Sequence, residues 1–134
     1  MTLHLTLKKQ FFNEILSGEK TKEYKEVKPY WIKRLCNIGT LIKDESTLSI
    51  FGVSEQDLKK GVINECKNGK YTYKKFTSII FKNGYQTNAP EFEIECLGIE
   101  VQNNISTSLG YGSFFVLHLG KILNKRNIQY GQNK

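Results

Sequence analysis

Residues 91–96 alternate strictly between charged and apolar side chains, and this alternation constrains the fold more than any other feature of the chain. Successive side chains of a strand point to opposite faces, so a period of two predicts a half-buried strand. The same period occurs at residues 2–8, and a third apolar segment, 114–123, is predicted to be the last long strand. The residues expected on the inner rows are Leu3, Leu5, Leu7, Phe92, Ile94, Cys96, Phe115, Leu117 and Leu119.

Two short helices are expected between these strands. Phe11, Phe12, Ile15 and Leu16 recur at three- and four-residue spacings, which is typical of a helix with one apolar face. Gly18 follows where a left-handed C-terminal cap is expected, so this helix should end at Ser17. Residues 21–27 then suit a strand, and Pro29 suits the first turn of a second helix.

These elements predict one α+β domain over residues 1–134. A chain of 134 residues with 39% hydrophobic side chains can bury a substantial core. Five to six strands, with two short helices near the N-terminus, suggest a small closed or nearly closed mixed barrel.

Residues 37–75 carry a weaker pattern. A strand is expected at 47–53, and Ser54 has the position of a helix N-cap, with Gly61 expected to end that helix early. The Asn68–Gly69 pair predicts a hairpin turn, followed by a strand at 71–73. Further on, the polar, glycine-containing segment 103–112 is expected to be a loop.

Several classes of protein are disfavoured. We find no apolar run near the roughly 20 residues of a membrane span and no signal peptide, so a soluble cytoplasmic protein without membrane contact is expected. Cys36, Cys66 and Cys96 are odd in number and stand outside metal-binding spacings. They are predicted to be reduced thiols, with Cys96 in the core, and no metal or cofactor is expected. Walker, Rossmann and esterase motifs are absent.

The net charge favours an anionic partner. The chain carries a formal charge of +7, with a pI near 9.3. The basic excess concentrates between Lys8 and Arg34, where eight basic residues face four acidic ones. A positive surface attracts polyanions whatever their sequence, so an anionic partner is expected.

The segment Gly18–Lys25, which reads G-E-K-T-K-E-Y-K, gathers charged groups around one corner. In a strand, Glu23 and Lys25 share a face, and Lys20 lies in the loop before it. On a solvated surface such a group of charges stabilises the fold by roughly 0 to 1 kcal/mol and indicates no function. In a cleft it could hold a phosphate or a polarised carbonyl, with Glu23 accepting a proton.

This segment resembles the G-x-K-x-x-E-x-R signature of ASCH domains, which are relatives of the PUA RNA-binding barrel. Residues 28–35, 79–85, 91–101 and 114–123 resemble ASCH segments in the same order, and 37–75 would be an insertion. The chain departs from the signature at Lys25, where the family usually has arginine. A lysine cannot reproduce the bidentate fork that arginine offers to phosphate or to a guanine edge.

The resemblance implies a basic cleft that binds RNA or a nucleotide-like ligand. Lys20, Lys25 and Arg34 would neutralise phosphate, and Glu23 would accept a hydrogen bond from a base amine. Tyr30 or Tyr85 would stack on a base, and Asn83 would line the mouth of the barrel beside Lys20. Trp31 could also be a stacking platform, but we predict it to be a core residue.

Two other functions stay open. Some ASCH-like proteins are amidohydrolases that act on N4-acetylcytidine with a lysine and a threonine. Lys20 matches that lysine, but Glu23 occupies the place of the threonine. Here Glu23 could act as a base towards water while Lys20 polarises the acyl oxygen, which makes both candidate catalytic residues. The third possibility is an adaptor domain whose basic cleft binds an acidic protein.

Overall fold

The chain folds as a mixture of strands and helices, with strands predominating. The computed structural model describes residues 1–37 and 54–128, so the strand expected at 47–53 lies outside the described residues. Its helices are α1 (Lys9–Leu16), α2 (Pro29–Leu35) and α4 (Glu55–Lys67). Its strands are β1 (Thr2–Thr6), β2 (Lys22–Glu26), β3 (Cys36–Asn37), β4 (Thr72–Tyr73), β5 (Ser78–Lys82), β6 (Glu91–Thr107) and β7 (Gly110–Arg126).

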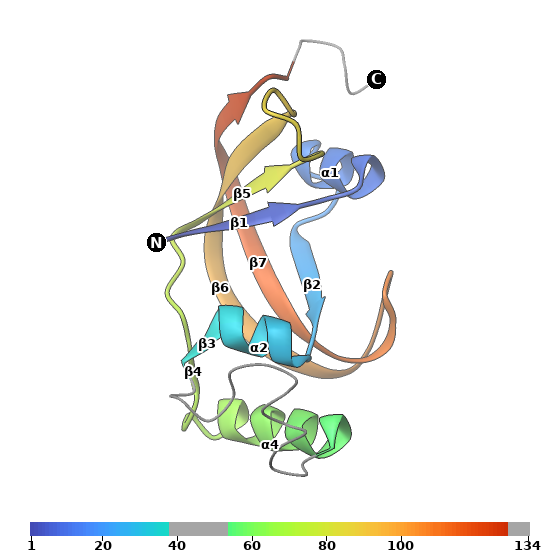
Figure 1. The fold of residues 1–134 in the computed structure, drawn as a ribbon, viewed down its shortest axis with the longest axis vertical. Coiled ribbons are helices and arrows are strands. Elements are labelled where there is room, and N and C mark those ends of the chain that lie inside the picture. The colour runs from blue at the N-terminus through green and yellow to red at the C-terminus, as the bar shows by residue number, and fades with distance from the viewer. Residues whose placement is uncertain (38–53, 129–134) are drawn as a thin grey trace. The chain divides into compact units, whose positions relative to one another are not determined.

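Five strands form the main sheet in the order β1-β5-β6-β7-β2, and β3 pairs with β4 in a separate two-stranded sheet. β1 and β5 lie side by side and run parallel (Figure 1), and their register places Leu3 opposite Ile79. β5 pairs with β6 in antiparallel fashion, with Phe81 opposite Phe92. Leu3, Ile79, Phe81 and Phe92 are all buried, so the inner rows predicted for the first strand and for the start of β6 are confirmed.

The chain divides into two compact units, and the long strands β6 and β7 contribute residues to both. Unit 1 comprises the described parts of residues 1–23, 75–98 and 117–134. Its core is aromatic, because the Phe12 ring of α1 lies 4.9 Å from the Phe92 ring, which lies 5.5 Å from that of Phe81. Burying the apolar face of α1 in this way is what stabilises so short a helix.

Unit 2 comprises the described parts of residues 24–74 and 99–116. Ile32 and Leu35 give α2 a fully buried face, and Val62 does the same for α4. Phe115 of β7 is also fully buried, and Tyr73 of β4 meets it edge-on with ring centroids 6.3 Å apart.

The end of α1 confirms the predicted glycine cap. The N–H of Ser17 donates to the Asn13 carbonyl at 2.9 Å, and the N–H of Gly18 donates to the Ile15 carbonyl at 3.1 Å. Gly18 has a φ of +84°, a conformation that costs a residue with a side chain roughly 1 kcal/mol or more. The chain therefore leaves α1 at a fixed angle and enters β2.

The predicted end of the third helix is wrong. Ser54 is the N-cap, and its hydroxyl accepts from the Asp57 N–H at 3.1 Å, as expected. α4 nevertheless continues through Gly61 to Lys67, because the buried side chains around it outweigh the cost of one glycine. Gly69 has a φ of +83° directly after the C-cap, so the Asn68–Gly69 pair ends a helix and does not form a hairpin turn.

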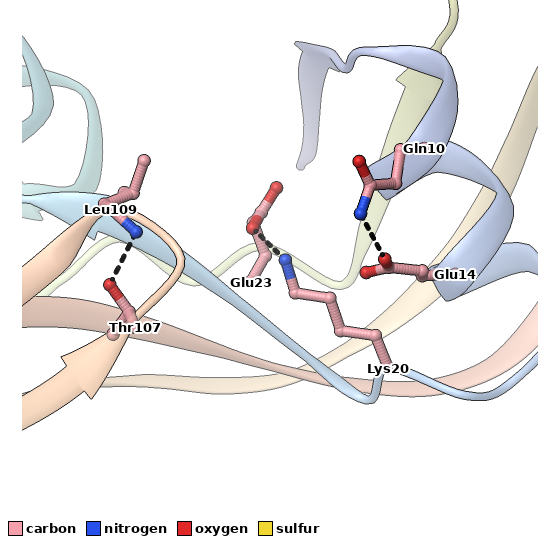
Figure 2. Close-up of polar contacts among 6 residues, drawn as sticks. All are labelled: Gln10, Glu14, Lys20, Glu23, Thr107 and Leu109. Carbon is pink, nitrogen blue, oxygen red and sulfur yellow. Dashed lines mark hydrogen bonds and ion pairs between the residues drawn. The ribbon is translucent and has the colours of Figure 1, made fainter.

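The loop predicted at 103–112 is also wrong. β6 runs to Thr107, β7 starts at Gly110, and the chain reverses between them. The Thr107 hydroxyl accepts from the Leu109 N–H at 3.0 Å (Figure 2) and donates to the Gly110 carbonyl at 3.1 Å. The polar residues of segment 103–112, which suggest a loop, therefore lie mostly on the exposed ends of β6 and β7.

Within the described part of the chain, no helix combines the length and the apolar character that a membrane span requires.

Candidate functional site

Lys20 and Glu23 form a close ion pair at the start of β2. The Lys20 Nζ lies 3.0 Å from the Glu23 Oε1, and Figure 2 shows the lysine side chain extending from the loop before β2 to that carboxylate. The backbone is held on both sides of Lys20. The Lys20 N–H donates to the Glu14 carbonyl of α1 at 3.0 Å. The carbonyl of the next residue, Thr21, accepts from the Leu119 N–H of β7, also at 3.0 Å.

The Lys20–Glu23 pair is shielded from water. The side chains are 18% and 7% exposed respectively, so this is not the solvated surface pair of the simplest interpretation. The ammonium also lies 5.1 Å from the centroid of the Phe11 ring, within the range of a cation–π contact. Chemically, the pair offers a fixed carboxylate with an ammonium beside it, which could hold a polar ligand or orient a water molecule.

A second group of predicted residues lies together in unit 2. We call Lys25, Tyr30, Trp31 and Arg34 the α2 cation–aromatic cluster. The Lys25 Nζ lies 4.7 Å and the Arg34 guanidinium carbon 5.4 Å from the centroid of the Trp31 ring. Arg34 also lies over the Tyr30 ring at 5.5 Å and donates from Nη1 to the Tyr30 hydroxyl at 3.1 Å.

The prediction that Trp31 is a core residue is wrong, because its side chain is only partly buried. Ile32 and Leu35, three residues apart, provide the buried face of α2 instead. Tyr30 is 60% exposed and meets Trp31 edge-on, with ring centroids 4.8 Å apart. The cluster thus places aromatic surface and two cations within one short stretch of the chain.

The remaining two predicted residues differ in their surroundings. Asn83 lines a hollow of about 310 Å³ in unit 1, and its N–H donates to the Pro90 carbonyl at 2.9 Å. The lysine of this hollow is Lys9, not Lys20. Its full lining is Lys9, Phe12, Asn13, Asn83, Gln86, Pro90 and Ile128. Tyr85 is 90% exposed and is not part of that lining.

The cysteines differ from the prediction in their burial. All three are free thiols, as expected, but Cys36 is the buried one and Cys96 is half-buried. Cys36 and Cys66 are hydrogen-bonded to each other, which the sequence did not indicate. They stand thirty positions apart, and their contact depends on how α4 and β3 pack. Among residues 1–37 and 54–128 there is no group of three or more metal-ligating side chains.

Comparison with known proteins gives no further assignment. Neither a family model, nor a characterised protein, nor a solved structure matches the chain significantly. Membership of the ASCH family therefore stays a prediction from the residues of the Gly18–Lys25 motif and the segments after it.

Proposed function

We propose that this chain is an ASCH-type domain that binds single-stranded RNA or a nucleotide-like ligand, with the α2 cation–aromatic cluster as its main contact. The observation that carries the proposal is the composition of this cluster. Lys25 and Arg34 each lie within 5.5 Å of an aromatic ring, and Tyr30 beside them is 60% exposed. Single-strand binding proteins combine aromatic surfaces, on which bases stack, with cations that neutralise the backbone.

In this proposal Tyr30 supplies the stacking surface, which is worth roughly 1 to 3 kcal/mol per base. Arg34 is held by the Tyr30 hydroxyl and can offer a planar fork to a phosphate. Lys25 acts as a point charge, so it adds affinity without fixing the orientation of the phosphate. This combination suits recognition that depends on the backbone and on base stacking more than on base identity.

The proposal includes a PUA-like barrel. It is supported by the five-stranded order β1-β5-β6-β7-β2, which mixes parallel and antiparallel pairs, and by helices inserted after each of the first two strands. Glu23 belongs to unit 1 and is proposed as a contact separate from the cluster: it accepts a hydrogen bond from a base amine, and Lys20 keeps the carboxylate in place at 3.0 Å.

The test is a binding titration by fluorescence anisotropy with a labelled 12-nucleotide single-stranded RNA of mixed sequence. The Tyr30→Ala variant should bind about 5- to 150-fold more weakly, because one stacking contact is lost. The Lys25→Gln/Arg34→Gln double variant should also flatten the salt dependence. Each phosphate contact contributes about 0.7 to the slope of log K against log salt, so the slope should fall by about 1.4.

A matched control carries the same loss of charge elsewhere in unit 2. Lys60 and Lys67 are exposed on α4, and the Lys60→Gln/Lys67→Gln variant should leave the salt slope nearly unchanged. Circular dichroism should confirm that every variant is folded. A slope that changes equally in both double variants would reduce the binding to nonspecific charge attraction and refute the proposed contact.

A second candidate function rests on the Lys20–Glu23 pair. A shielded carboxylate beside an ammonium could activate water for the hydrolysis of an acyl amide, with Lys20 polarising the acyl oxygen. Incubation with N4-acetylcytidine, followed by chromatography for cytidine and acetate, tests this reaction. Turnover that is lost in Glu23→Gln and kept in Glu26→Gln would support the hydrolase. Absence of turnover in the unmodified protein would leave the binding function alone.

A further inference from the structure

The two thiols of unit 2 that hydrogen-bond to each other come from different elements. Cys36 opens β3 immediately after α2 and is 3% exposed, whereas Cys66 lies in the last turn of α4 and is half-buried. Each thiol shifts the pKa of the other, so the two side chains are neighbours within unit 2.

Backbone hydrogen bonds hold the two cysteines in this arrangement. Cys36 pairs in register with Tyr73 of β4, and the Lys74 N–H donates to the Leu35 carbonyl at 2.8 Å. The chain that leaves α4 returns at once, since the Tyr71 N–H donates to the Glu65 carbonyl at 3.0 Å. The end of α4 is thereby held next to the β3–β4 pair, and the meeting of the thiols follows from the local topology.

The charged and titratable groups around the pair make the two thiols unequal. The hydrogen bond from Cys36, aided by one from the Tyr73 hydroxyl, lowers the pKa of Cys66 to about 7, although burial and Glu65 act in the opposite direction. The same hydrogen bond, together with burial, raises the pKa of Cys36, which the charge of Lys74 only partly offsets. Near neutral pH about half of the Cys66 side chains are therefore thiolates, whereas Cys36 keeps its proton.

We propose that Cys36 and Cys66 form a peroxide-sensitive site that closes to an intramolecular disulfide. In the first step the Cys66 thiolate attacks one oxygen of hydrogen peroxide. The O–O bond breaks, Cys66 becomes a sulfenic acid, and hydroxide leaves and takes up a proton. In the second step the Cys36 sulfur attacks the Cys66 sulfur, the S–O bond breaks, and the Cys36 proton leaves with the hydroxyl as water. The peroxide is the oxidant, and the two thiols together supply two electrons.

The third cysteine provides an internal comparison. Cys96 is also half-buried, but it belongs to unit 1, and burial raises its pKa. Thiolates are the reactive form towards peroxides, so Cys66 should react at least about tenfold faster than Cys96 at neutral pH. This inference is independent of the proposed RNA binding, because it rests on residues outside the α2 cation–aromatic cluster.

The experiment treats the fully reduced protein with one equivalent of hydrogen peroxide at pH 7.5, followed by alkylation and tryptic digestion without reductant. The three cysteines fall in separate tryptic peptides, which span residues 35–43, 61–67 and 83–121. The expected first product is a mass that joins peptides 35–43 and 61–67, smaller than their sum by two hydrogen atoms. Peptide 83–121 should remain alkylated, and the protein should run as a monomer on a nonreducing gel.

Two variants complete the test. Cys96→Ser should form the same link at the same rate. Cys36→Ser should accumulate Cys66 sulfenic acid, which dimedone labels, because the second thiol is gone. Oxidation of Cys96 before Cys66, or a first product that joins two chains, would overturn the proposal. The order of cysteine oxidation and any link between two chains are both measured on the protein without substitutions, so a variant that fails to fold does not obscure the result.

Discussion

Replacing Lys20 with methionine tests whether the Lys20–Glu23 pair behaves as a buried ion pair. Methionine keeps much of the length of the side chain and removes its charge. The Glu23 side chain is 7% exposed, so it cannot recover its lost partner by turning into water. A carboxylate that stays buried after losing its ion-pair partner destabilises the folded state much more than an exposed carboxylate would.

The expected magnitude follows from this burial. Removing one partner of a buried pair typically costs about 3 to 5 kcal/mol of unfolding free energy. Glu23 has a further interaction besides the one with Lys20, so the lower end, about 3 kcal/mol, is expected. With a urea m value of about 2 kcal/mol per molar, the unfolding midpoint should fall by about 1.5 M.

The Lys28–Glu26 pair provides a matched control. Its charged atoms lie 3.2 Å apart, but its side chains are 53% and 48% exposed. Lys28→Met should therefore cost less than about 1 kcal/mol. Urea titrations followed by circular dichroism, run on both variants under the same conditions, measure the contrast.

A double variant separates the pair from its surroundings. Lys20→Met/Glu23→Leu removes both charges and should recover most of the lost stability, because no buried charge is left behind. The reasoning is refuted if Lys20→Met and Lys28→Met destabilise the protein equally, or if the double variant is less stable than Lys20→Met alone.

Three further predictions concern other parts of the chain. Gly61→Ala should stabilise the protein by about 0.5 to 1 kcal/mol in thermal or urea unfolding, because Gly61 lies inside α4 and an added Cβ would meet no atom within 4 Å. Ser54→Ala should cost about 1 kcal/mol through loss of the hydrogen bond to Asp57, and Ser54→Asp should retain most of the stability; equal losses would contradict the capping role. Alkylation of Cys66 by iodoacetamide should rise with pH around a midpoint near 7, since its thiolate forms there, whereas Cys96 should need a higher pH; mass spectrometry of the tryptic peptides follows both, and identical profiles would contradict the assignment.

Local signals in the sequence predicted several elements well. The alternation at 2–8 and 91–96, the glycine after α1, Pro29 at the start of α2 and Ser54 before α4 are all confirmed. Each of these features acts through its immediate neighbours in the chain. A helix cap, the fixed φ of a proline and an alternating strand pattern can each be recognised from neighbouring residues alone.

Predictions of secondary structure fail where packing between distant segments outweighs the local preference of the chain. Gly61 costs α4 about 1 kcal/mol, but the buried Leu58 and Val62 beside it outweigh that cost. The Asn68–Gly69 pair predicts a hairpin although it ends a helix, because a hairpin turn and a helix C-cap both need a glycine with positive φ. The segment 103–112 is polar because it lies on long, largely exposed strands.

The candidate site could be predicted only in part. The sequence indicated that Lys20 and Glu23 meet, since they lie three residues apart across a turn, and the distance of 3.0 Å confirms this contact. Their degree of burial was not predictable, because it depends on the packing of side chains from other elements. The contact between Cys36 and Cys66 had no local signal at all, and only the fold reveals it.

The order of strands in the main sheet has a consequence for synthesis on the ribosome. Thr2 of β1 pairs with Ser78 of β5, and β2 neighbours β7, so both edge strands emerge long before their partners. At roughly 5 to 20 residues per second, the nascent β1 waits several seconds for β5, and β2 waits longer still. We expect the β6–β7 hairpin to form first and the two early strands to dock onto it late. Until then the apolar face of β1, which carries Leu3 and Leu5, has no partner strand, whereas β2 is mostly charged and can wait in water without exposing such a face.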